Sequence, residues 1–190
     1  MTSRAIIPVK LSLTEGDFYT LWAPNWKEHG AEWQAFLGDD SGLYLFTSPA
    51  KLYAFLQSGK RHDLVSHPKW GHFDTLPADM IVPDKKETFD IIGTPAFLAG
   101  RPSYENVAAV ARSFQMTKSL AEVLGIDDVI LFFASHSVLG NVQRGADHYS
   151  GEHGLGEWSA VGRTVLDNWP TVVAGLDEQV RVIDVSEEET

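Results

Sequence analysis

Protonatable side chains are concentrated in one glycine-rich stretch of the sequence, SHSVLGNVQRGADHYSGEHGLGEW, which runs from Ser135 to Trp158. It contains three of the seven histidines and five of the sixteen glycines. Imidazole and carboxylate groups can transfer protons, bind metal ions or pair with charged groups of a ligand. Glycine lets the backbone approach a ligand closely. The stretch is therefore predicted to be a flexible functional segment rather than part of the core.

One hypothesis for this stretch is a small hydrolase-like or metal-assisted enzyme. It would use His136 and His148 together with a carboxylate, either Glu157 or Asp147. The local motifs do not identify such a site. Two of the histidines are five residues apart, which differs from the HExxH zinc motif, and no G-x-S-x-G elbow surrounds Ser135. The sequence thus predicts no metal ion and no cofactor, and the enzyme is the alternative hypothesis.

The hypothesis that we favour is a recognition surface without catalysis. On a helix that begins near His136, the side chains of Asn141, Arg144 and His148 would share one face. Arginine presents a planar fork that suits a carboxylate or a phosphate. A solvated helix face followed by an irregular loop would give the same pattern. The full set of predicted binding residues is Ser135, His136, Ser137, Asn141, Arg144, His148, Tyr149, Trp22 and Trp26.

The tripeptide Ser135-His136-Ser137 follows an apolar run that resembles a buried strand, Asp128–Ala134. Ligands often bind at the carboxyl end of a strand, because the amides of the next helix face that position. Either serine could instead simply cap the helix that follows.

Aromatic residues form a second candidate surface near the amino terminus. Half of the six tryptophans lie between residues 22 and 33. The pentapeptide WAPNW has the composition of a loop, and tryptophans in loops often anchor protein partners. Trp22 and Trp26 are therefore candidate anchors, with packing in the core as the alternative. Helical spacing from Trp26 to Leu37 also predicts a short amphipathic helix there.

The charge of the chain restricts its partners. The formal net charge is −11, and the only adjacent basic pairs are Lys60-Arg61 and Lys85-Lys86. General nucleic-acid binding needs clustered cations that neutralise phosphates, so direct binding of DNA or RNA is not expected. A protein partner that is itself basic, or a small anionic ligand at a local cation, fits the charge better.

The location is predicted from what the composition excludes. The chain has no cysteine, which excludes disulfides and thiolate sites. Its first residues do not resemble a signal peptide, and no apolar run approaches the roughly 18 residues that a membrane span requires. We therefore expect a cytoplasmic protein that does not bind membranes.

Strand and helix patterns roughly alternate along the chain, which predicts an α/β fold, with α+β as a variant. The 190 residues suit one domain over residues 1–185, built on a mixed sheet of about five or six strands covered by helices. Residues 186–190 are expected to form an acidic tail. The predicted strands are Ala5–Leu13, Phe18–Trp22, Leu43–Phe46, Thr88–Ile92, Asp128–Ala134 and Val180–Val185. Besides the amphipathic helix above, helices are predicted after Ser48, after Ser103 and from Glu157.

Several segments resemble one known family across nearly the whole chain. They are LTEGDFYTLWAP, LYLFTSPAKLYAFL, HPKW, RPSYENVAAVAR, FFASHSVLGNVQRGADHYSG and GLGEW. The chain is similar to an actinobacterial family of small, uncharacterised intracellular proteins that are sometimes labelled primosomal protein. The resemblance implies no catalytic residues. It adds a second alternative function, a DNA-replication accessory factor that acts through protein contacts.

Overall fold

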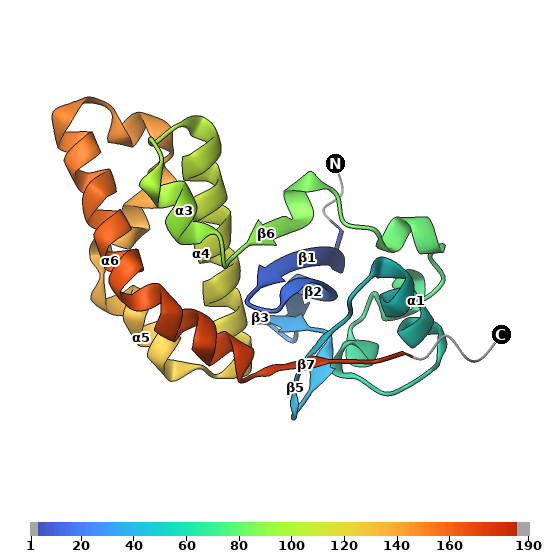
Figure 1. The fold of residues 1–190 in the computed structure, drawn as a ribbon. Helices are drawn as coiled ribbons and strands as arrows, with labels where there is room; N and C mark the ends of the chain where they lie inside the picture. The colour runs from blue at the N-terminus through green and yellow to red at the C-terminus, as the bar shows by residue number, and fades with distance from the viewer. Residues whose placement is uncertain (1–3, 186–190) are drawn as a thin grey trace. The chain divides into compact units, whose positions relative to one another are not determined.

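The computed structural model describes residues 4–185 of the chain (Figure 1). The predicted acidic tail lies outside these described residues. Contacts between Cα atoms divide the chain into two compact units. Within the described part, the first unit comprises residues 4–11, 16–88 and 179–185, and the second comprises residues 12–15 and 89–178. Cooperative unfolding of residues 1–185 as one domain stays a prediction.

The strands form two sheets rather than one. The first has the order β3-β2-β1-β6 and the second the order β4-β5-β7, in which β5 and β7 are parallel. The mixed α/β class is confirmed, although the strands that we expected in a single sheet are shared between these two. The strands are β1 (Ile7–Leu13), β2 (Gly16–Glu28), β3 (Ala31–Phe36), β4 (Gly38–Asp39), β5 (Gly42–Leu45), β6 (Thr88–Asp90) and β7 (Val180–Val182).

The predicted amphipathic helix near Trp26 is wrong, because this part of the chain forms the β2–β3 hairpin. Trp26 lies opposite Trp33 and Trp22 lies opposite Phe36 in antiparallel register. The ring centroids of these pairs are 5.3 Å and 5.9 Å apart, respectively. The aromatic spacing thus arises from cross-strand pairs, which stabilise a hairpin.

Short helices complete the first unit. Ser48 caps α1 (Pro49–Gln57) as predicted, since its hydroxyl accepts a hydrogen bond of 3.2 Å from the amide of Lys51. Two histidines, His62 and His67, are buried nearby. The His67 ring packs against Trp26 with centroids 4.7 Å apart. The other helices of this unit are η1 (Asp63–Ser66), α2 (Trp70–Phe73), η2 (Ala78–Ile81) and η3 (Lys85–Glu87).

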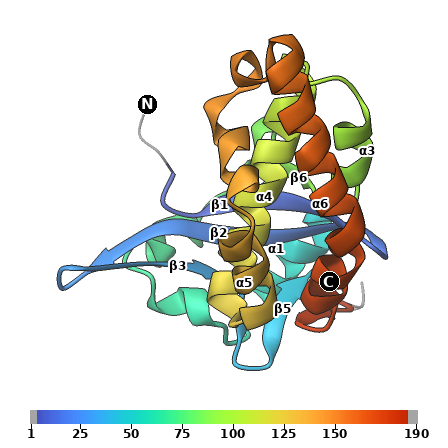
Figure 2. The ribbon, with the colours of Figure 1, turned by 90° about the vertical axis from the view of Figure 1, so that its left-hand side faces the viewer.

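The second unit is mainly helical, and Figures 1 and 2 show α3, α4 and α6 side by side. Trp169 lies at its centre, where the indole N–H donates to the carbonyl of Ile91 over 2.8 Å. Ser103 caps the long helix α4, as predicted, and Gly125 ends it with a φ of 67°. The helices are α3 (Thr94–Ala99), α4 (Tyr104–Leu124), α5 (Asp127–Ser135), η4 (Ser137–Arg144), η5 (Ala146–Tyr149) and α6 (Gly151–Asp177).

The predicted buried strand Asp128–Ala134 is wrong, because this segment forms α5. A short apolar run has no periodicity that separates a strand from a helix. In the structure Val129 and Phe132, three residues apart, are buried, whereas Leu131 is exposed. The remaining predicted strands are confirmed. Within residues 4–185, no helix combines the length and the apolar composition that crossing a membrane requires.

Candidate functional site

The Ser135–Trp158 segment is helical over most of its length: the helix expected to begin near His136 is present as η4, and η5 and α6 follow it in place of an irregular loop. It contains the end of α5, then η4 and η5, and the first two turns of α6. Helix α6 begins at Gly151, six residues before the predicted start at Glu157. Gly154 and Gly156 therefore lie inside a helix.

Ser135, His136 and Ser137 do not form an anion site at the end of a strand. Ser135 is the last residue of α5, and His136 takes the N-cap position of η4, but its side chain makes no capping hydrogen bond to that helix. The His136 ring contacts Phe132 instead: Nδ1 lies 2.7 Å from its carbonyl oxygen, and the ring centroids are 5.0 Å apart. Neither serine acts as the cap of η4.

Glu157 is the centre of a polar cluster that joins η4, η5 and α6. The Asn141 side-chain amide donates to Glu157 Oε1 over 3.0 Å, and His148 Nε2 contacts Glu157 Oε2. The His148 and Glu157 side chains are each 22% exposed. The structure thus brings together Asn141 and His148 from the predicted face. Arg144 is exposed and forms no ion pair with any described residue.

Tyr149 is buried beside this cluster. Its ring packs edge-on against Trp158, with centroids 5.0 Å apart, and its hydroxyl has no hydrogen-bond partner among the described residues. Burial, with a contribution from the charge of Glu157, raises the pKa of Tyr149 to about 12. Gly154 permits this arrangement, because a Cβ there would lie 2.4 Å from the Tyr149 carbonyl carbon. Tyr149 is thus a packing residue rather than an exposed contact.

The cluster pairs one imidazole with one carboxylate. A carboxylate that orients an imidazole can assist proton transfer, but covalent catalysis also needs a nucleophile within reach. His136, the other imidazole of the enzyme hypothesis, contacts Phe132. Among residues 4–185, no three His, Asp or Glu side chains are placed to hold a metal ion. The geometry is that of a polar network that fixes η4 and η5 against α6.

Trp22 and Trp26 belong to the core of the first unit. Each is only 7% exposed, and the Trp22 indole donates to Gln34 Oε1 over 3.1 Å. Trp26 packs between Trp33 and His67. These tryptophans therefore offer little surface to a partner. The expected loop WAPNW is part of strand β2.

An open pocket of about 380 Å³ lies where the segment meets the start of α4. Tyr104 is 73% exposed at its rim, and its hydroxyl donates to Asp147 over 2.6 Å. This hydrogen bond raises the pKa of Tyr104. Sequence reasoning missed Tyr104, because an aromatic residue in the first turn of a helix does not by itself indicate exposure. The lining residues are Arg101, Pro102, Ser103, Tyr104, Ala146, Asp147, Tyr149, Ser150, Gly151 and Leu155.

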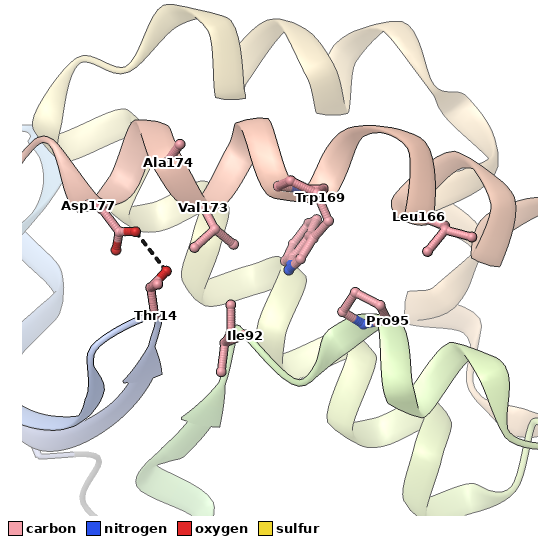
Figure 3. Close-up of a pocket in the computed structure, with 9 residues that line it drawn as sticks. Thr14, Ile92, Pro95, Leu166, Trp169, Val173, Ala174 and Asp177 are labelled. Atoms are coloured by element: carbon pink, nitrogen blue, oxygen red, sulfur yellow. Dashed lines mark hydrogen bonds between the residues drawn. The ribbon is translucent and has the colours of Figure 1, made fainter.

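A second pocket, of about 410 Å³, lies along α6 in the same unit (Figure 3). Its walls are apolar except at one end, where the hydroxyl of Thr14 donates to Asp177 Oδ2 over 2.7 Å. No sequence motif indicated this pocket, because its residues come from three separate parts of the chain. They are Thr14, Ile92, Pro95, Leu166, Trp169, Pro170, Val173, Ala174 and Asp177.

Comparisons with known proteins identify the family. No curated protein matches the chain. A crystal structure described as the SatS C-terminal domain in complex with bromine matches with a TM-score of 0.64 and 16% sequence identity. The match covers 94% of each chain, and at this identity it shows the fold alone. The family model of the SatS C-terminal domain matches residues 6–177. The chain therefore belongs to the SatS C-terminal domain family.

Proposed function

We propose that this chain is a non-enzymatic, cytoplasmic interaction protein with a regulatory role. It recognises a protein partner through the surface that the Ser135–Trp158 segment forms with the start of α4. The observation that carries the proposal is the open pocket between these elements, with Tyr104 and Leu155 exposed at its rim.

The rim has the properties of an anchoring site for a partner. Tyr104 is held in its exposed position by the hydrogen bond to Asp147, so its ring loses little further freedom on binding. Leu155, 50% exposed, adds apolar area on α6. Tyrosine is among the residue types that most often dominate binding energies.

Two arginines place exposed cationic groups on this surface, among the carboxylates of Asp147, Glu152 and Glu157. Arg101 lines the pocket and Arg144 ends η4; both are exposed, and neither forms an ion pair within residues 4–185. The guanidinium fork binds carboxylates in a bidentate manner. We therefore expect the partner to present a carboxylate here, and a small anionic ligand is the alternative occupant.

Two variants test the surface on a partner first identified by affinity capture and mass spectrometry, then purified. Tyr104→Ala and Arg144→Ala should each weaken binding several-fold, because both remove exposed groups of the proposed surface. Each should change the free energy of unfolding by only about 0.5 kcal/mol or less. Leu131→Ala on α5 and Arg163→Ala on α6 are the matched controls, since both residues are exposed outside the segment.

The opposite pattern would refute the proposal. If Tyr104→Ala and Arg144→Ala bind the partner as tightly as the unaltered chain, whereas the control variants bind it more weakly, the partner binds to another surface. If the chain turns over a substrate, and Glu157→Gln abolishes this turnover but not the binding of the substrate, the enzyme hypothesis is supported instead.

A further inference from the structure

We propose that the apolar pocket along α6 is a binding site for a small amphipathic amine, a ligand with a compact hydrocarbon body and one ammonium group. All nine lining residues belong to the second unit. None of them lines the pocket near Tyr104. The site is thus separate from the surface proposed for the protein partner.

The walls of the pocket select the hydrocarbon body. Figure 3 shows Ile92, Val173 and Trp169 around the middle of the pocket, with Pro95 and Leu166 towards the far end. A concave site of about 410 Å³ with these walls suits a small apolar group. Leu166 is 67% exposed, so a bound hydrocarbon would also cover apolar surface that otherwise faces water.

The polar end of the pocket selects a cation. Asp177 is the only charged residue that lines it, and among the described residues no lysine or arginine forms an ion pair with Asp177. Asp177 is also the last residue of the 27-residue helix α6, whose last turn contains no basic residue. The carbonyl end of a helix carries partial negative charge, so a carboxylate there favours a nearby cation. An ammonium group would supply that charge.

The pocket offers hydrogen-bond acceptors and no free side-chain donor. The Thr14 hydroxyl already donates to Asp177, and the Trp169 indole already donates to Ile91. Pro170 has no N–H, so it cannot donate the usual helical hydrogen bond to the carbonyl of Leu166. A ligand must therefore provide the donors, which an ammonium group does and a carboxylate does not.

Binding of three six-carbon probes to the full chain tests the charge selection: n-hexylammonium, 1-hexanol and hexanoate. Titration calorimetry and the indole N–H resonance of Trp169 report binding at the pocket. We expect saturable binding of hexylammonium, weaker binding of hexanol and none of hexanoate. Within the alkylammonium series, each added methylene should tighten binding about fourfold until the pocket is filled.

Asp177→Asn removes the charge but keeps an oxygen that accepts from Thr14, so the local fold should persist. It should weaken hexylammonium binding about tenfold and leave hexanol binding unchanged. Asp167→Asn is the matched control, because Asp167 is exposed on the same helix and does not line the pocket. Equal binding of hexylammonium and hexanoate, or equal hexylammonium affinity in Asp177→Asn and Asp167→Asn, would overturn the proposal.

A second variant supplies the cation within the chain. Ala174→Lys places an ammonium group three residues before Asp177 on α6, within reach of its carboxylate. It should abolish hexylammonium binding, whereas Ala108→Lys, at an exposed position of α4, should not. Undiminished binding by Ala174→Lys would exclude Asp177 as the recognition group.

Discussion

Gly154 and Gly156 lie two residues apart in α6, yet the structure predicts opposite effects when each is replaced by alanine. At Gly154 a Cβ would lie 2.4 Å from the Tyr149 carbonyl carbon, 2.6 Å from its Cα and 2.7 Å from its oxygen. Ordinary contacts begin at 3.4 Å, so the junction of η5 and α6 would have to open by about 1 Å, the difference between 3.4 and 2.4 Å. At Gly156 a Cβ meets nothing within 4 Å.

The magnitudes follow from two competing effects. Replacing a helical glycine with alanine stabilises a protein by about 0.5–1 kcal/mol through helix propensity. Forcing extra atoms into a packed site costs about 1–3 kcal/mol. Gly156→Ala should therefore raise the free energy of unfolding by about 0.5–1 kcal/mol. Gly154→Ala should lower it by about 1–2 kcal/mol, because the clash is with backbone atoms that cannot rotate away.

Urea unfolding followed by circular dichroism at 222 nm measures both changes, provided that the denaturant slope stays constant. The pair controls for helix propensity, since both substitutions occur in the same helix. Stabilisation by Gly154→Ala of the same size as by Gly156→Ala would refute the reasoning. Tyr149 would then not pack closely against the start of α6.

Two further predictions concern the buried side chains. Burial lowers the pKa of His62 and of His67 below the ordinary value of 6.5. Because both rings are neutral in the folded and the unfolded chain above pH 6.5, their contribution to the free energy of unfolding is fully present there. This contribution should be lost as the pH falls through the lower pKa values that the two rings have in the folded chain. The melting temperature of His62→Phe should therefore fall less between pH 7 and pH 5 than that of the unaltered chain. Trp26→Ala and Trp158→Ala, in different units, should each cost about 3–5 kcal/mol and shift one shared calorimetric transition. Two separate transitions, each shifted by one variant, would contradict the single-domain prediction.

Local signals in the sequence determined a large part of the fold. The start of α1 was marked by Ser48 before Pro49. The two ends of α4 were marked by Ser103 and Gly125. Such caps can be recognised in the sequence because they depend on neighbouring residues alone. Short apolar runs, one of them alternating, likewise located most strands. The concentration of polar groups in Ser135–Trp158 also indicated the Glu157 cluster.

Tertiary contacts decided the elements whose local pattern was ambiguous. The run Asp128–Ala134 is compatible with a strand or a helix. In the structure it forms α5, with Val129 and Phe132 buried on one face. The tryptophans from 22 to 33 fit a helical spacing, but cross-strand pairing places them in a hairpin. Gly154 lay outside the helix predicted from Glu157, and only the structure shows that the Tyr149 backbone lies too close for a Cβ at this position.

The candidate sites depended most on the tertiary structure. Arg144 and His148 have helical spacing, yet only His148 contacts Glu157, because Gly145, with a φ of 87°, interrupts the helix between them. The pocket at Asp177 combines residues 14, 92 and 177, which no sequence window contains together. Sequence proximity determines which groups share a turn or a cap. Chain packing determines which distant groups share a pocket, because contacts between remote segments form only when the core buries its apolar side chains.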